Sequence, residues 1–223
     1  MLARPPRSAL QQVTTQSARC QMCATRSTCL LNVVPLANAE LLAPFIRERP
    51  FSKSDLLQQQ GDVATHISIV KLGTVMGLRR GPDGTERPVA LFGRGQLMGA
   101  YALLGQRNQL SGLALSSGRV CEISISDLYR QGVLDRQFLE SVYTMIIASV
   151  GHLADWAQVM RVKGVQQQLM LALRLLSKAQ GSPLIRLPSH VALAALLSTT
   201  RETVARSLRQ LANEGWLVRQ DRW

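Results

Sequence analysis

Four cysteines place the strongest constraint on how this chain can fold. Cys20, Cys23 and Cys29 follow one another in the pattern C-x2-C-x5-C, and the fourth cysteine, Cys121, lies far along the chain. Four thiolates are the ligand set of one iron–sulfur cluster or of one structural zinc ion. If one centre uses all four, the fold has to bring Cys121 against the N-terminal three.

The surroundings of these cysteines favour a metal or redox centre. Residues 19–30 contain Arg19 and Arg26 and no acidic residue, and nearby cations lower the pKa of a thiol. No apolar run predicts a membrane helix, and Met1–Arg19 lacks the apolar region of a secretory signal. We therefore expect a cytoplasmic protein, in which clustered cysteines are more often metal ligands or redox sensors than structural disulfides. An iron–sulfur cluster, a zinc site and a redox-active thiol pair all remain open.

Positive charge is concentrated in the C-terminal third of the chain. The formal net charge is +12, the sequence pI is about 10.7, and residues 161–223 contain ten Lys and Arg against three Asp and Glu. Such a concentration predicts a polyanionic partner, most simply nucleic acid. A basic surface that only keeps the protein soluble is the alternative.

The spacing of apolar residues and glycines divides the first part of the chain into two regions. Residues 1–19 have no periodicity and are expected to form a flexible tail. Residues 20–134 contain the cysteine loop, a helical stretch near 37–47 that Pro44 interrupts, and a sensor domain. In that domain short apolar runs alternate regularly with turns, which is typical of a β-barrel or β-roll. The expected strands lie at 67–70, 75–78, 89–92, 113–115 and 120–125, with a hairpin turn at 82–84.

Residues 135–163 are expected to form one long helix. One set of positions recurs in alternating steps of four and three, which is the spacing of a coiled-coil seam. A second apolar set is expected to pack back on the β-domain, so the helix would have two buried faces. This predicts a homodimer, and a long core helix within one subunit is the alternative. The expected seam is Val142, Ile146, Ser149, Leu153, Trp156 and Met160, and the second set is Phe138, Leu139, Met145, Val150 and Ala157.

Residues 164–223 are expected to form a DNA-binding domain. Two short helices joined by a tight turn at Ser198 and Thr199 predict a helix-turn-helix, and Thr199-x-x-Glu202 fits a capping box for the second helix. On that helix the apolar residues Val204, Leu208 and Leu211 form one stripe, and the charged residues Glu202, Arg206 and Arg209 lie opposite. The other expected elements are a helix at 165–180 that stops at Gly181, a helix through Leu196 capped by Ser189, and strands at 184–187 and 216–219.

A recognition helix needs this division into an apolar and a charged face. On the charged face, an arginine such as Arg206 can pair bidentately with guanine, and Glu202 can accept a hydrogen bond from cytosine. Arg201, Arg209 and Arg219 suit contacts with phosphates. A solvated charged face on an ordinary surface helix is the alternative.

Arg201-Glu-Thr-Val-Ala-Arg206 resembles the R-E-T-V-x-R recognition helix of the CRP/FNR superfamily of bacterial transcription regulators. The order of the regions is also similar, and the resemblance covers residues 20–223. Within the superfamily, the four-cysteine pattern resembles the oxygen-sensing branch typified by the fumarate and nitrate reduction regulator (FNR). The resemblance implies an α+β fold with an N-terminal double-stranded β-roll of the cyclic-nucleotide-binding type, a dimerisation helix and a C-terminal winged helix-turn-helix.

The resemblance also implies a mechanism. A [4Fe-4S] cluster on the four cysteines would promote dimerisation and promoter binding, and oxygen would reverse both by degrading the cluster. Asp155 falls where FNR-like proteins carry an aspartate that opposes dimerisation. Implied DNA contacts are Thr200, Arg201, Glu202, Ala205, Arg206 and Arg209, and an implied RNA polymerase contact is the loop with Asp83, Gly84, Thr85 and Glu86.

Several positions depart from the superfamily pattern. Ala205 stands where FNR-like helices have serine, Ser198 replaces the usual turn glycine, and the wing is expected to be short. Ala100 occupies the position of the acid that a cyclic-nucleotide pocket needs, and Leu110-Ser111 the position of its arginine, so no cyclic nucleotide is expected. The three histidines, His66, His152 and His190, are scattered without a nucleophile–base grouping, so no enzymatic activity is expected.

Overall fold

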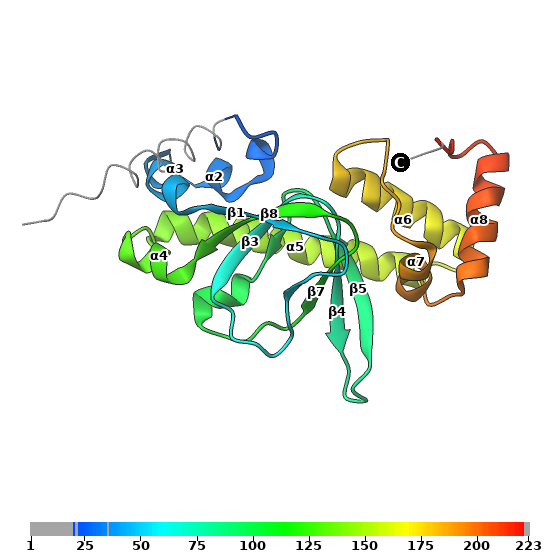
Figure 1. The fold of residues 1–223 in the computed structure, drawn as a ribbon, viewed down its shortest axis with the longest axis horizontal. Coiled ribbons are helices and arrows are strands. Elements are labelled where there is room, and N and C mark those ends of the chain that lie inside the picture. The colour runs from blue at the N-terminus through cyan, green and yellow to red at the C-terminus, as the bar shows by residue number, and fades with distance from the viewer. Residues whose placement is uncertain (1–19, 21, 35, 221–223) are drawn as a thin grey trace, which may run out of the picture.

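The computed structural model describes residues 20, 22–34 and 36–220, and the expected tail of residues 1–19 lies outside these ranges. The fold is α+β, as predicted. A β-domain made of two four-stranded sheets lies beside a long helix, and a group of C-terminal helices follows at one end (Figure 1). No helix in the described ranges is both long and apolar enough to cross a lipid bilayer.

Short helical turns connect the cysteines to the β-domain. Cys29 caps helix α2, because its sulfur accepts a hydrogen bond from the Leu31 amide at 3.3 Å. Leu30 and Leu31 are buried, so the segment is anchored on the apolar core. Pro44 lies in the 3-10 turn that follows α3, where the sequence predicts an interruption. The elements are η1 (Arg26–Thr28), α2 (Leu30–Val33), α3 (Leu36–Leu42) and η2 (Ala43–Phe45).

The two sheets are antiparallel and contain all five predicted strands. The first has the order β1 (Arg47–Phe51), β8 (Gly118–Ser124), β3 (His66–Leu72) and β6 (Leu97–Met98). The second has the order β2 (Leu56–Gln58), β7 (Ser111–Ala114), β4 (Val75–Arg80) and β5 (Glu86–Phe92).

Strand β8 lies between β1 and β3, and this places Cys121 beside Glu48 on one side and Ile69 on the other. Ile125 was expected to end the last strand. It instead begins α4 (Ile125–Arg130), because the Ser124 hydroxyl caps that helix by accepting from the Asp127 amide at 3.1 Å. The 3-10 turn η3 (Ala100–Leu104) connects β6 to β7.

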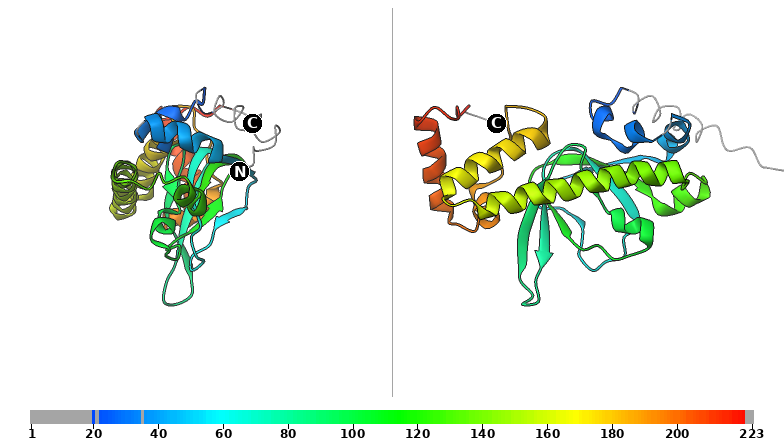
Figure 2. Two further views of the ribbon diagram at one scale, coloured as in Figure 1. Left: turned by 90° about the vertical axis from the view of Figure 1, so that its left-hand side faces the viewer. Right: turned by 180° about the vertical axis from the view of Figure 1, so that it is seen from behind.

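The long helix α5 (Arg136–Arg161) is capped by Asp135, whose carboxylate accepts from the Phe138 amide at 2.7 Å. Figure 2 shows it running along the β-domain. The predicted dimer seam is wrong, because it lies on the buried face of α5. Val142 and Trp156 have no exposed surface within a single subunit. The remaining seam positions Ile146, Leu153 and Met160 pack against the same subunit's core, and the Ser149 hydroxyl donates to the Met145 carbonyl.

The opposite face of α5 carries the exposed apolar residues Tyr143, Ile147 and Val150, with exposed Ala154 and Ala157 continuing the stripe. Val150 and Ala157 therefore do not pack on the β-domain as expected. The reason is that β5 and α6 cover the side of α5 that carries Trp156. Asp155 is half-buried between the two faces.

The C-terminal domain contains α6 (Val165–Gln180), α7 (His190–Leu196) and α8 (Arg201–Asn213), close to the predicted bounds. The predicted cap of α8 is wrong by one residue: the Thr200 hydroxyl, not that of Thr199, accepts from the Thr203 amide at 3.2 Å. Ser198 has φ 51°, which explains why a glycine would suit this turn. Residues 184–187 and 216–219 form no strand in the described part of the chain, because neither finds a pairing partner there.

Candidate metal centre and nucleic-acid interface

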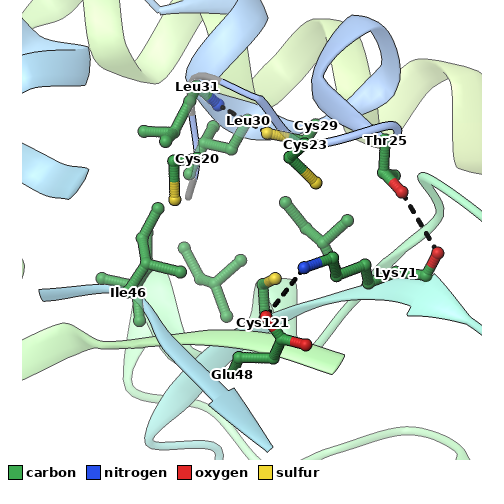
Figure 3. A pocket seen from close by; sticks show the side chains of 13 residues that line it. Cys20, Cys23, Thr25, Cys29, Leu30, Leu31, Ile46, Glu48, Lys71 and Cys121 are labelled. Atoms are coloured by element: carbon green, nitrogen blue, oxygen red, sulfur yellow. Dashed lines mark hydrogen bonds and ion pairs between the residues drawn. The ribbon is translucent and has the colours of Figure 1, made fainter. Parts of the chain in front are cut away.

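The four cysteine side chains line one cavity (Figure 3). Cys20, Cys23 and Cys29 reach it from the cysteine segment, which we define as residues 20–29, and Cys121 reaches it from the central strand β8. The fold thus brings the distant cysteine to the N-terminal three. The other lining residues are Thr25, Leu30, Leu31, Ile46, Glu48, Ile67, Ile69, Lys71 and Ile123.

The cavity disfavours free thiolates. Burial raises the pKa of the Cys121 thiol to about 12, and burial also raises the pKa values of Cys20 and Cys29. All four cysteines are free of disulfides. Because metal ligation requires deprotonated thiols, a bound metal centre would have to displace protons from this apolar site.

An ionic group that the sequence analysis missed stands at the wall of the cavity. Lys71 Nζ lies 2.7 Å from Glu48 Oε2, and an Arg119 nitrogen lies 2.9 Å from Glu48 Oε1. The hydrogen bond from Lys71 lowers the pKa of Glu48, so the carboxylate is ionised. The Lys71 cation also opposes the effect of burial on Cys121 and Cys20. Only the strand register reveals this group, because Glu48, Lys71 and Cys121 lie on three different strands.

The donor set fits an iron–sulfur cluster in number and kind, since such clusters take four cysteine thiolates. The apolar side chains around it limit contact with water, which is one of the levers by which a protein controls such a centre. Within the described residues, no three His, Cys, Asp or Glu side chains are grouped as the ligands of a single metal ion. The thiols share the cavity without converging on one point.

Helix α8 presents the division into two faces that the sequence predicts. Val204 and Leu211 are fully buried and Leu208 is partly buried, whereas the charged residues of the other face are exposed. Thr200 caps the helix at its N-terminal end. The exposed charged residues are Arg201, Glu202, Arg206 and Arg209, and Ala205 lies half-buried beside them. Their contacts with bases and phosphates stay predictions.

The expected RNA polymerase loop is the tip of the β4–β5 hairpin, which projects from the β-domain in Figure 1. Arg87 pairs with Asp83, and Arg80 pairs with Glu86 at 3.0 Å. The Thr85 amide donates to the Asp83 carboxylate. These contacts order the tip, and its role in binding polymerase stays a prediction.

Two protein-family models match this chain. A cyclic nucleotide-binding domain matches residues 48–131, and a Crp-like helix-turn-helix domain matches residues 167–223. Together these matches span more than half of the chain. The chain belongs to the CRP/FNR family of transcription regulators.

Relatives of this CRP/FNR-family regulator agree with that assignment. The cyclic AMP receptor protein of Thermus thermophilus is 27% identical over 187 residues, covering 79% of this chain and 82% of its own. The anaerobic regulatory protein of Aggregatibacter actinomycetemcomitans is 27% identical over 105 residues, covering 47% of this chain and 41% of its own, which is less than half. The solved structure of FixK2 from Bradyrhizobium japonicum has a TM-score of 0.66 at 20% identity, covering 79% of this chain and 89% of that chain. This last likeness concerns the fold alone.

Proposed function

We propose that this regulator responds to oxygen through a [4Fe-4S] cluster held by Cys20, Cys23, Cys29 and Cys121. The observation that carries the proposal is the meeting of these four thiols around one cavity, although Cys121 comes from a strand far along the chain. A second support is the partial match to a protein named as an anaerobic regulator. When bound, the cluster supplies an oxygen-labile centre.

The chain's own residues have distinct tasks at this centre. The four sulfur atoms hold it, and the apolar side chains of Leu30, Ile69 and their neighbours exclude water. Lys71 places a positive charge near the thiolates, and Glu48 orients that charge through their 2.7 Å ion pair. Positive charge favours a centre whose thiolate ligands give it net negative charge.

The output is the binding of promoter DNA by a homodimer. The exposed apolar stripe on α5 supports pairing of two subunits, because a row of Tyr143, Ile147 and Val150 at coiled-coil spacing is otherwise left in water. The exposed face of α8 supports reading of a major groove. Each subunit would bind one half-site, and the β4–β5 hairpin would contact RNA polymerase.

Cyclic nucleotides are not part of this proposal. Neither Ala100 nor Leu110 can supply the ionic contacts that a ribose and a cyclic phosphate need. The adjacent Ser111 is buried, and its hydroxyl already accepts a hydrogen bond from the Gln60 amide at 3.0 Å.

A zinc site with the same four ligands is the competing function, because the thiol donor set suits zinc equally. Thiol–disulfide sensing has less support, because burial raises the pKa of Cys121 to about 12 and a protonated thiol is a poor nucleophile.

Anaerobic purification with added iron and sulfide tests the proposal. We expect a brown protein with visible charge-transfer absorbance that air bleaches, with iron and sulfide in equal amounts. Cys121→Ser should lose the iron, whereas Met22→Ala, in the same segment but with an exposed side chain, should keep it. A colourless protein containing stoichiometric zinc would instead establish the competing function.

A further inference from the structure

One four-residue turn touches both the cysteine segment and the DNA-binding domain. Residues 93–96, which we name the bridging turn, join strand β5 to strand β6. Figure 1 shows the cysteine segment and helix α6 on the same side of the β-domain. The turn has contacts in both directions, and each involves a glycine.

The contact with the cysteine segment is at Gly95, which has φ +79°. A Cβ atom on Gly95 would lie 2.4 Å from Thr28 Oγ1 and 2.5 Å from Thr28 Cβ, so the glycine backbone packs directly on Thr28. Thr28 immediately precedes the proposed ligand Cys29, and its hydroxyl donates to the Thr25 carbonyl at 3.2 Å. A movement of Cys29 therefore displaces a side chain that the turn touches.

The contact with the DNA-binding domain is at Gly93 and Arg94. A Cβ atom on Gly93 would lie 2.7 Å from the Ala179 carbonyl oxygen, and the Arg94 amide donates to that same oxygen at 2.8 Å. Ala179 lies in the last turn of α6. The Arg94 guanidinium also lies close to Gly181, which caps α6, and a cation there suits the negative end of the helix dipole.

The turn is fixed to strand β3 between these contacts. The Gly95 amide donates to the Val70 carbonyl at 2.8 Å, and the Val70 amide donates to the Gln96 carbonyl at 3.1 Å. The next residue of β3 is Lys71, whose carbonyl accepts from the Thr25 hydroxyl at 3.1 Å. These hydrogen bonds tie the turn to the same strand that holds the cysteine segment through Thr25.

The contact with α6 is also poised to change. Arg94 Nε is buried with no hydrogen-bond partner among the described residues. Burying an unpaired donor costs free energy, so this arrangement is less stable than a fully paired one. A rearrangement of the turn that gave this donor a partner would therefore be favoured.

We propose that the bridging turn couples the cysteine segment to helix α6 within one subunit, so that the state of the cysteines reaches the DNA-binding domain directly. The regulatory role of this coupling rests on the proposed iron–sulfur function. Ligation would fix the position of Cys29, and any resulting movement of the adjacent Thr28 would press on or release Gly95 and so alter the contact of the turn with Ala179. Helix α8 packs on α6 and follows, in addition to any effect on dimerisation.

The first test needs no iron. Gly93→Ala places a methyl group against the Ala179 carbonyl, and amide hydrogen exchange is measured by NMR. The Thr28 and Cys29 amides, which bond to Thr25 and Arg26 carbonyls, should exchange about tenfold faster, although they are distant in sequence. Gly81→Ala is the control, because its methyl group meets only the ends of the Arg87 and Asp83 side chains.

Thr28→Ala keeps the inference falsifiable if the first variant does not fold. It removes atoms that touch Gly95 without creating a clash, and it should alter exchange of the Arg94 amide while the β4–β5 hairpin amides stay unchanged. Exchange at Thr28, Cys29 and Arg94 that is the same as in the unmodified protein would overturn the coupling.

The second test adds iron and sulfide under anaerobic conditions. Loading should change exchange at Arg94, Gly181 and Ser182 in the unmodified protein, and Thr28→Ala should remove that change while keeping full iron content. A change that persists in loaded Thr28→Ala protein would overturn the coupling. A protein that takes up no iron but passes the first test retains the coupling and disproves the iron–sulfur function.

Discussion

Lys71 Nζ lies 2.7 Å from Glu48 Oε2, on the wall of the cavity that the four cysteine thiols line. The pair is mostly shielded from water, with side-chain exposures of 25% for Lys71 and 18% for Glu48. Burial raises the pKa of Cys121 to about 12, and the Lys71 cation acts against that rise. Lys71 is therefore expected to help the thiols give up their protons to a metal centre.

Lys71→Met should weaken retention of iron by roughly 10–100-fold, the usual effect of changing a residue that supports metal ligands. The variant loses the cation, so the negative charge of Glu48 beside the thiolates is no longer balanced by Lys71. Iron content after graded chelator challenge measures the effect. Arg119→Met is the matched control, because Arg119 pairs with the same carboxylate but its side chain is 59% exposed. Equal iron loss in the two variants would contradict a specific role for Lys71.

Arg206 and Arg209 should give different phenotypes when each is changed to Ala. Arg206→Ala is expected to cost roughly 1–3 kcal/mol on a selected duplex and to relax base preference at one position, because it loses a bidentate base contact. Arg209→Ala should weaken binding to all sequences and reduce the salt slope by about one, because it loses a phosphate contact. Fluorescence anisotropy over a series of salt concentrations and single-base variants separates the two. A sequence-selective loss in Arg209→Ala would move that residue into the base-reading set.

Ile147→Glu should dissociate the proposed dimer. Ile147 is 71% exposed in the single subunit and lies at the centre of the apolar stripe on α5. A charge buried in a subunit interface carries a desolvation penalty, so the dimer dissociation constant should rise by at least about tenfold. Analytical ultracentrifugation of the reconstituted protein measures the constant. Gln137→Glu adds the same charge to an exposed position on the same helix and should leave the dimer intact.

The sequence did not identify which face of α5 packs against the β-domain. Residues spaced by four and three occur on two sides of this helix, and both sides are apolar, so spacing alone cannot say which one meets the β-domain. The answer depends on tertiary contacts: Trp156 packs under β5, and His152 lies 2.7 Å from the Leu91 carbonyl oxygen. The stripe through Ile147 is left exposed as a result.

Other features were predictable because they depend on local backbone chemistry or on the number of cysteine ligands that a metal centre needs. Helix α6 ends at Gly181 in the left-handed conformation, as a C-terminal glycine predicts. The need for four ligands predicts that Cys121 returns to the cysteine segment. The helix cap was not predictable, because Thr199 and Thr200 are both able to cap. The Glu48–Lys71 pair was not predictable either, because it depends on strand register.

Trp156→Ala should destabilise the fold of each subunit. The indole is fully buried in the core, so its removal is expected to lower the free energy of unfolding by about 3–5 kcal/mol. Denaturant titration measures the change. Trp216→Ala makes the same substitution at a 67% exposed residue and should change stability by less than about 0.5 kcal/mol. If Trp156→Ala dissociated the dimer without lowering the stability of each subunit, Trp156 would belong to the dimer seam that the sequence predicts.

His152 should make the stability of the fold depend on pH. Burial lowers the pKa of His152, while Asp155 favours and Lys178 opposes the charged form, and its Nε2 lies within hydrogen-bond distance of both the Leu91 carbonyl and the Trp156 indole nitrogen. The ring therefore binds a proton less readily in the folded protein than in the unfolded chain, where its pKa is near 6.5.

The free energy of unfolding should therefore be greatest above about pH 7 and fall as the pH is lowered from there toward about 5, because protonation favours the unfolded chain. His152→Gln keeps a donor and an acceptor at this site without a titrating group, so its stability should fall less over the same range. Denaturant titrations at several pH values, with the difference between the two proteins as the readout, isolate this residue from all other titrating groups. Parallel pH profiles would show that His152 titrates alike in the folded and unfolded states.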